Sequence, residues 1–345
     1  MKTSVISKTA IVGLGLFGLL AGGAQANPVA SGETALKLDK PVAKVLKRNG
    51  VSVTPVKPAK VKQGAIAFPV TGGNLDPQTA AGTLRHSGGL KFRAGRTKLV
   101  TKSFIVKTGK GNVLSGLVGG SRVNLLKLDL AKAKIKRDGL GIMVSKVGAS
   151  LTGTAAKALN ATFGVKLFKA NMRLGHVIVK AQPESVGLEA SGSTDLTLDP
   201  GTAQALTDLG VTAAPVDPAS VTPAGAIAFP ITGGRANTST FAGRIDHSGG
   251  ISLTAGSTRV ELTEFQINVD DEPDLTAKLG DDRVSILSLD LSALEPNVSG
   301  RRITLGNVTA KLTAGAASAL NAAFSTTAFT EGLVLGKATV NAVAR

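Results

Sequence analysis

Apolar and polar residues alternate along much of the chain with a period of two, which is typical of β-strands that have one buried face. Val260 and Leu262 start one such run, and Phe265, Ile267 and Val269 continue it after one extra residue. The extra residue predicts a bulge or a bend in that strand. Glycine-rich turns separate the runs, among them Ala94-Gly95, Gly109-Lys110-Gly111, Gly119-Gly120 and Asp138-Gly139. Many short strands with such turns predict an all-β fold, an antiparallel sandwich or barrel.

Two segments in each half of the chain have helical spacing instead. Asp39 is a suitable N-cap for the first, and Gly50 is a stop signal at its end. The same pattern returns between Asp199 and Gly210. Thr152 and its counterpart Thr313 are expected to cap a second helix, whose apolar residues recur every fourth position. These residues are Ala155, Leu159 and Phe163 in one half, and Ala316, Leu320 and Phe324 in the other.

The mature chain consists of one unit repeated twice. The segment from Gly64 to Gly73 recurs from Gly225 to Gly234 with a single difference, Val70 against Ile231. Other matched segments have nearly the same spacing, and a repeat of this length is the size of a domain and not of a solenoid unit. We therefore expect two tandem antiparallel β-domains with two short helices each, at residues 33–182 and 194–345. Residues 183–193, rich in glycine and serine, are predicted to be the linker.

The first 26 residues have the pattern of a secretory leader. Lys2 and Lys8 precede an apolar stretch from Ala10 to Ala21, which is short for a membrane span. Ala24-Gln25-Ala26 is a small-x-small cleavage signal. Residues 1–26 are therefore predicted to be a signal peptide. The protein is expected to be secreted, and then either released as an extracellular protein or held non-covalently at the cell envelope.

The composition excludes several kinds of chemistry. The chain has no cysteine, tyrosine or tryptophan, so disulfides, thiolate metal sites and thiol nucleophiles are excluded. Neither paired carboxylates nor a nucleophile with a base recurs in both repeats, and no enzymatic activity is predicted. The acidic run from Asp270 to Asp274 lacks the spacing of a calcium loop, so a solvated turn is expected and no metal site.

His86 and His247 are the only histidines present in both repeats, each within a His-Ser-Gly-Gly segment. An imidazole can ligate haem iron, so one interpretation makes each of them a cofactor ligand, one per domain. The alternative is a histidine at a strand end whose ring bonds a local carbonyl. Repeated Asp129 and Asp290 are expected to face solvent, and repeated Asn160 and Asn321 to bond a loop backbone.

The order of these segments resembles the Htaa domain family of secreted actinobacterial proteins. The resemblance covers Gly82 to Phe92, Leu128-Asp129-Leu130 and the helix after Leu151, and again their counterparts from Gly243, Leu289 and Leu312. It implies an all-β fold with small helices and a link to haem capture at the cell surface. The family's axial ligand is a tyrosine, which this chain lacks, and the family's pocket histidine would align near Gly95-Arg96. The resemblance therefore implies the fold without the family's ligand set.

The two repeats carry opposite charge. Residues 33–192 contain 28 Lys and Arg against 7 Asp and Glu, a net charge of +21, whereas residues 193–345 have a net charge of −6. The basic side chains that have no basic counterpart in the second repeat include Lys107, Lys110, Lys132, Lys134, Lys136 and Arg137. They predict binding to an anionic cell-envelope polymer or surface. Without tyrosine or tryptophan for base stacking, sequence-specific nucleic-acid recognition is not expected.

The leading interpretation is therefore a secreted, non-enzymatic binding protein of the cell envelope, held on anionic surfaces by its lysine-rich domain. The alternative is capture of haem or an iron ligand by one pocket per repeat, near His86 and His247. The charge split also leaves open docking of a basic domain on an acidic one, within a chain or between chains.

Overall fold

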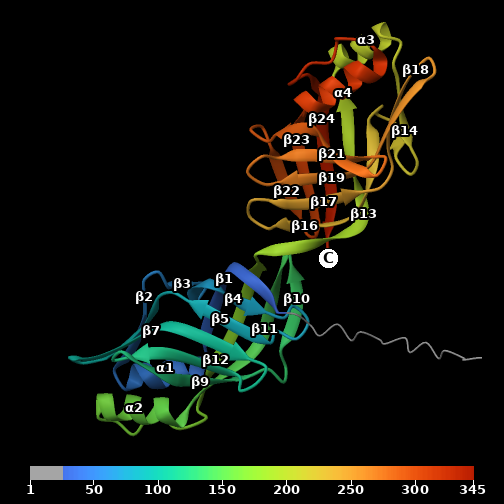
Figure 1. The fold of residues 1–345 in the computed structure, drawn as a ribbon. Helices are drawn as coiled ribbons and strands as arrows, with labels where there is room; N and C mark the ends of the chain where they lie inside the picture. The colour runs from blue at the N-terminus through green and yellow to red at the C-terminus, as the bar shows by residue number, and fades with distance from the viewer. Residues whose placement is uncertain (1–25) are drawn as a thin grey trace, which may run out of the picture.

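The computed structural model describes residues 26–345 and shows two β-barrels that follow each other along the chain (Figure 1). The predicted leader lies outside the described residues, apart from Ala26. Each barrel has its own antiparallel sheet of twelve strands, and no strand is shared between the sheets. The predicted all-β class and the two tandem domains are confirmed, and the architecture is the barrel and not the sandwich. Within residues 26–345, no helix combines the length and apolar character needed to cross a bilayer.

In the first barrel, eight strands close in the order β7-β5-β4-β1-β12-β11-β9-β8, because β8 pairs back onto β7. Strands β6 and β2 continue outward from β7, while β3 and β10 flank β4 and β11. The strands are β1 Asn27–Leu38, β2 Val51–Val56, β3 Lys60–Lys62, β4 Ala65–Leu75, β5 Gly82–His86, β6 Gly89–Ala94, β7 Thr97–Thr108, β8 Val113–Val118, β9 Ser121–Asp129, β10 Lys134–Asp138, β11 Gly141–Leu151 and β12 Arg173–Pro183.

The second barrel repeats this topology strand for strand, in the order β19-β17-β16-β13-β24-β23-β21-β20, and β20 pairs back onto β19. Its outward pair is β18 and β14. The strands are β13 Ser185–Leu198, β14 Thr212–Val216, β15 Ser220–Val221, β16 Ile227–Asn237, β17 Gly243–His247, β18 Gly250–Ala255, β19 Thr258–Val269, β20 Asp274–Leu279, β21 Asp282–Asp290, β22 Glu295–Ser299, β23 Arg302–Leu312 and β24 Val334–Ala344.

Two short helices cover one end of each barrel, and these ends lie at opposite ends of the molecule (Figure 1). The helices are α1 Lys40–Arg48, α2 Gly153–Phe163, α3 Pro200–Asp208 and α4 Ala314–Phe324. Thr152 and Thr313 cap α2 and α4 as predicted, because each hydroxyl accepts a hydrogen bond from the amide three residues on. Asp39 occupies the N-cap of α1, but its carboxylate bonds Arg173 and His176 instead of helix amides.

The predicted irregularity between Leu262 and Phe265 is a β-bulge. Glu264 has a φ of 48°, and the register of β19 with β20 shifts at this point. Ser103, the equivalent residue of β7, has a φ of 54°. Each bulge keeps the residues on both sides of it facing the barrel interior. Asn160 and Asn321 also behave as predicted, since each side chain bonds the backbone of a buried phenylalanine, Phe168 or Phe329.

The segment predicted as a linker is mostly strand. Residues 185–193 belong to β13, which pairs with β16 and β24, and Glu184 alone separates β12 from β13. Gly192 has a φ of 93°, and a Cβ there would fall 1.9 Å from the carbonyl oxygen of Asn341. Glycine is therefore required at position 192 by the close approach of the paired strands β13 and β24, and not because the segment is a flexible connection.

The barrels meet end to end at this junction. Leu140, in the turn between β10 and β11 of the first barrel, is buried in the apolar core of the second. The guanidinium of Arg137 donates a hydrogen bond to the carbonyl oxygen of Arg345, at 2.8 Å. Among the described residues, every ion pair joins two residues of the same barrel. The described contacts across the junction thus include the apolar burial of Leu140 and a hydrogen bond from the Arg137 side chain, and no ion pair between an acidic and a basic side chain.

Candidate functional site: an apolar cavity in each barrel

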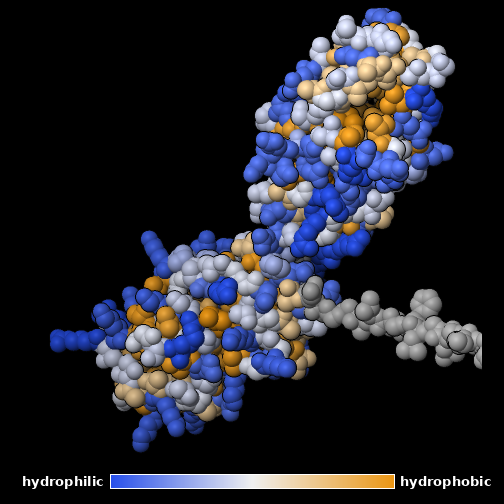
Figure 2. All heavy atoms as spheres, in the orientation of Figure 1, coloured by the Kyte–Doolittle hydropathy of each residue, from blue (hydrophilic) through white to orange (hydrophobic). Residues whose placement is uncertain are grey.

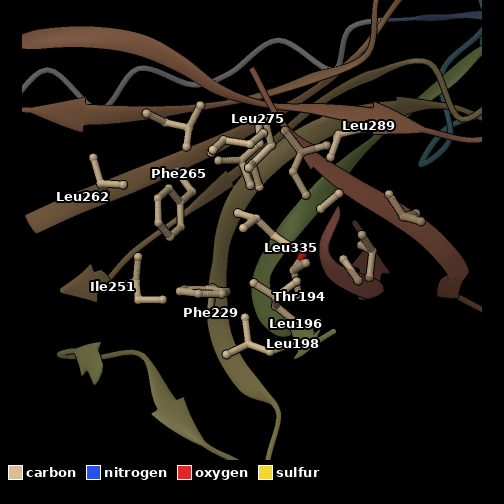
Figure 3. Close-up of a pocket in the computed structure, with 18 of the residues that line it drawn as sticks. Thr194, Leu196, Leu198, Phe229, Ile251, Leu262, Phe265, Leu275, Leu289 and Leu335 are labelled. Atoms are coloured by element: carbon tan, nitrogen blue, oxygen red, sulfur yellow. The ribbon is translucent and has the colours of Figure 1, made fainter. Parts of the chain in front are cut away.

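The interior of the second barrel contains a cavity of about 110 Å³. Its wall consists of apolar side chains from the closing strands, from α3 and α4 and from β18, and Thr194 is the single residue with a polar side chain among those described around it. In Figure 3, Phe229, Phe265, Leu262 and Ile251 lie around one side of this space, and Thr194 lies beside Leu196 and Leu198. Apolar atoms reach the surface beside α4 and the outward strands β14 and β18 (Figure 2).

The first barrel has an equivalent cavity of about 90 Å³ at its helix-covered end. Leu90 and Phe92 of β6, Phe68 and Phe104 of the barrel and Leu159 of α2 are part of its wall. The rings of Phe68 and Phe104 meet edge to face with centroids 5.1 Å apart, and Phe229 and Phe265 repeat this contact in the second barrel. Both barrels therefore leave an apolar space between the helices and the outward strand pair.

A buried histidine lies directly behind the wall of each cavity. Thr34 lines the first cavity, and its Oγ1 is 2.7 Å from Nε2 of His86. In the second barrel, Oγ1 of Thr194 is 2.7 Å from Nε2 of His247. The other ring nitrogen, Nδ1, is 3.4 Å from the carbonyl oxygen of Phe104 in the first barrel and 3.2 Å from that of Phe265 in the second. Both ring nitrogens are thus engaged in each repeat.

These contacts determine which nitrogen carries the hydrogen. A carbonyl oxygen only accepts, so Nδ1 is the donor, and Nε2 accepts from the threonine hydroxyl. Burial lowers the pKa of both histidines to about 4, and the hydrogen bonds to the two carbonyls oppose this effect without overcoming it. Each imidazole is therefore neutral at pH 7.

His86 and His247 were predicted either as cofactor ligands or as histidines that bond a local carbonyl. The structure places both on the last residue of a strand, only 5% exposed, with the carbonyl contact of the second interpretation. His176, which is not repeated, lies on the surface and pairs with Asp39. Ligation by His86 or His247 would require breaking the bond of Nε2 to its threonine.

The remaining candidates lie on the surface. Asp129 accepts a hydrogen bond from the amide of Ala131, and Asp290 pairs with Lys311 at 2.9 Å. Bonds from the Lys311 ammonium and from Ser292 hold the pKa of Asp290 well below its ordinary value. The carboxylate of Asp270 accepts a hydrogen bond from the amide of Glu272, as in a solvated turn. Among residues 26–345, no cluster of three His, Asp or Glu side chains suits a metal ion.

The basic side chains predicted to bind a polyanion are all exposed. Lys107 and Lys110 lie at the end of β7 and in the turn after it, and Lys132, Lys134 and Lys136 lie on or just before β10. The amide of Leu128 in β9 bonds the carbonyl of Asn112, so the turn that contains Lys110 lies against the end of β9. None of the five lysines forms an ion pair with another described residue. Arg137 differs, because its guanidinium is bound to Arg345 at the junction.

One cavity residue was missed from the sequence. Thr101 of β7 lines the cavity of the first barrel, and the same position in the second barrel is Leu262. Both belong to strands whose inward positions were recognisable from alternation. A comparison of the inward positions of the two repeats shows this difference, because a hydroxyl replaces an apolar side chain within an otherwise apolar face.

A comparison with solved structures found proteins with a similar fold, among them HtaA and HtaB. The C-terminal domain of HtaA from Corynebacterium glutamicum has 13% identity and a TM-score of 0.35, over 45% of this chain and 98% of that one. The haem-binding protein HtaB from Corynebacterium glutamicum has 14% identity and a TM-score of 0.30, over 47% of this chain and 95% of that one. No family model matches the chain, and no curated protein matches it in sequence.

The cavity residues do not fit haem as a ligated group. Of the described residues that line the two cavities, none carries a nitrogen or a sulfur atom in its side chain. Haem iron is held in proteins by histidine, cysteine, methionine or tyrosine, and the nearest such groups, His86 and His247, have both nitrogens bonded. The cavity volumes are also below the roughly 300–1,000 Å³ of ordinary cofactor sites.

Proposed function

We propose that this protein is a non-enzymatic binding protein in which each barrel holds one small apolar ligand. The observation that carries the proposal is the presence of an apolar cavity at the same place in both barrels. Eight-stranded barrels have interiors of a size that either fills with side chains or holds one small ligand. Here the side chains leave about 110 and 90 Å³, and a larger dry apolar cavity, of about 150 Å³, is known to take benzene.

The proposal is supported by what the cavity walls lack. Acid–base catalysis needs a titratable group within reach of the substrate, and the described side chains around both cavities are hydrocarbon or hydroxyl. Affinity would arise from removal of apolar surface from water, at about 25 cal/mol per Å².

Toluene is a suitable first probe, and cavity-filling variants provide matched controls. We expect toluene at a hundred times its Kd to stabilise each barrel by about 2.7 kcal/mol. Leu90→Trp should abolish this effect in the first barrel only, and Ile251→Trp in the second only, because these equivalent residues line the two cavities. Scanning calorimetry measures the two transitions. The proposal fails if toluene changes neither transition, or if it acts equally on the filled barrels.

Haemin tests the alternative of haem capture, the activity named for the structurally similar HtaB. The proposed function predicts no saturable Soret shift that depends on histidine. A shift near two equivalents that disappears in the variant with His86→Ala and His247→Ala would instead establish haem as the ligand. A shift that persists in this variant would show haem held by the apolar or basic surface.

A second proposed function, retention of the exported protein on anionic cell-envelope polymer, is supported by the concentration of charge in the first repeat. Each lysine near an anionic surface contributes about 1 kcal/mol, and this attraction is screened by salt. We expect retention on immobilised teichoic acid that is lost between low and high salt. Substitution of Lys107, Lys110, Lys132, Lys134 and Lys136 by Glu should abolish retention at every salt concentration.

The control for this experiment reverses the same number of exposed charges at the helix-covered end. The substituted residues are Lys40, Lys44, Lys47, Lys157 and Lys166. The local surface around β10 is the binding site if this control keeps most of the retention. Equal losses in the two variants would show that only the net charge of the repeat matters.

A further inference from the structure

A third pocket, of about 270 Å³, lies at the junction of the two barrels, and we call it the junction pocket. It shares no residue with either apolar cavity. Its wall includes apolar side chains of the first barrel, among them Leu75 and Ile142, and three arginines, Arg137, Arg235 and Arg345. The junction pocket thus combines apolar surface with a group of like charges.

Two of the arginines flank a glycine on the outer face of the second barrel. Gly187 of β13 pairs with Arg235 of β16, and its carbonyl oxygen accepts a hydrogen bond from the amide of Arg345, which follows β24 on the other side. Residues opposite each other on neighbouring strands point to the same face. Both arginines are exposed, while the adjacent residues Ala236 and Ala344 are buried. Because glycine has no side chain, the space between the two arginine side chains stays open.

Hydrogen bonds orient two of the guanidinium groups and leave donors free. Nε of Arg235 donates to Oγ of Ser185 at 2.7 Å, and one terminal nitrogen of Arg137 donates to the carbonyl oxygen of Arg345. A guanidinium has five N–H donors. The two terminal nitrogens of Arg235 therefore stay available, since neither bonds a described residue.

The acidic side chains near the junction pocket do not neutralise these charges. Glu189 of β13 pairs with Arg301 at 2.8 Å, and Asp138 of β10 pairs with Lys180 at 3.0 Å. Glu184 is exposed, and no Asp or Glu is among the described residues that line the pocket. Guanidinium groups remain charged at any ordinary pH, so an anion placed between them would lower their mutual repulsion.

The arginines are not a feature of the repeated domain. The residues equivalent to Arg137, Arg235 and Arg345 in the other repeat are Val298, Asn74 and Glu184, respectively. The same barrel is thus built without them, and the three have in common their place at the junction.

We propose that the junction pocket binds a small molecule with an apolar body and one carboxylate group. The carboxylate accepts hydrogen bonds from Arg235 and Arg345 in the space beside Gly187, and the apolar body lies against Leu75 and Ile142. A guanidinium presents paired N–H donors that match the two oxygens of a carboxylate. The volume is near the lower end of the roughly 300–1,000 Å³ of small-molecule sites, which occur preferentially between domains.

2-Naphthoate tests the proposal against two control compounds. 2-Naphthamide keeps the apolar body without the charge, and acetate keeps the carboxylate without the body. In titration calorimetry at low salt, we expect the Kd of 2-naphthoate to be at least about tenfold lower than that of either control. The proposal is wrong if 2-naphthoate does not bind, or if one of the controls binds as tightly.

Arginine variants locate the binding site. Arg235→Gln and Arg345→Gln should each raise the Kd of 2-naphthoate by about tenfold, because each removes a charged donor. Arg96→Gln is the matched control, since it removes the same charge from the turn between β6 and β7 and should leave the Kd within about twofold. An equal loss of affinity in Arg96→Gln would mean that only net charge attracts the probe, and would overturn the proposal.

Gly187 allows a test that keeps every charge. Its backbone is outside the left-handed region, and an added Cβ would make an ordinary contact with Cδ of Arg345 at 3.6 Å. Gly187→Ala should therefore bind 2-naphthoate almost as tightly as the unsubstituted protein, whereas Gly187→Leu should abolish binding by filling the space between the arginines. If Gly187→Leu folds and binds normally, the carboxylate does not lie beside Gly187 and the proposal is wrong. The arginine variants decide the question if Gly187→Leu does not fold.

Discussion

Acidification from pH 7 to pH 4 is expected to destabilise each barrel by up to about 3 kcal/mol through its buried histidine. The pKa of His86 and of His247 is about 4 in the folded protein, against 6.5 for an ordinary histidine. The unfolded chain therefore binds protons more readily, and stability falls as the pH drops below 6.5. The contribution is fully present above pH 6.5 and is lost by about pH 4. Urea unfolding followed by circular dichroism at several pH values measures this loss.

Histidine variants show where the effect originates. His86→Gln should remove the pH dependence of the first barrel between pH 6.5 and 4 and leave that of the second. His176→Gln is the matched control, because His176 lies on the surface beside Asp39 and should leave both profiles unchanged. If the free energy of unfolding of the unsubstituted protein does not change between pH 6.5 and pH 4, the buried imidazoles accept protons without loss of their contacts.

Phe104→Ala is expected to destabilise the first barrel by about 3–5 kcal/mol. The ring is 3% exposed and packs edge to face on Phe68, so its removal loses apolar burial and leaves a void where the strands close. Phe265→Ala should have the same effect on the second barrel, where Phe229 is the partner. Scanning calorimetry should show two unfolding transitions, and each variant should lower the midpoint temperature of one of them.

Phe104→Ala and Phe265→Ala also test which calorimetric transition belongs to which barrel. The two core clusters share no strand, and Leu140 is the one residue of the first barrel buried in the core of the second. If either variant lowers both transitions equally, the contact of Leu140 couples the barrels into one cooperative unit. Leu140→Asp should then separate the transitions again.

Local signals in the sequence predicted most of the fold. Thr152 and Thr313 cap helices because the side-chain oxygen of a threonine can accept a hydrogen bond from an unpaired amide of the first helical turn. The extra residue before Phe265 corresponds to a bulge at Glu264. Barrel closure was not predictable in the same way. It depends on pairing of β8 with β7, and alternation shows which face of a strand is buried without showing its neighbour.

The predicted linker was wrong for a related reason. The glycines and serines of residues 183–193 have the composition of a flexible segment, but Gly192 lies where the paired strands β13 and β24 approach too closely for a Cβ. The candidate site was predicted in part. Repetition identified His86 and His247, each of which is hydrogen-bonded to a threonine that lines a cavity. The other residues of the cavity walls are ordinary core residues. Recognition of Thr101 as a cavity residue would have required a comparison of the inward-facing positions of the two repeats.

The end-to-end junction has a consequence for how the two cavities can be used. Only Glu184 separates the barrels along the chain, and the helix-covered ends point away from each other (Figure 1). One molecule therefore cannot close both openings around the same object. A molecule that lies with one end against a membrane or a wall still presents its other opening to the medium, so the two sites sample different surroundings at the same moment.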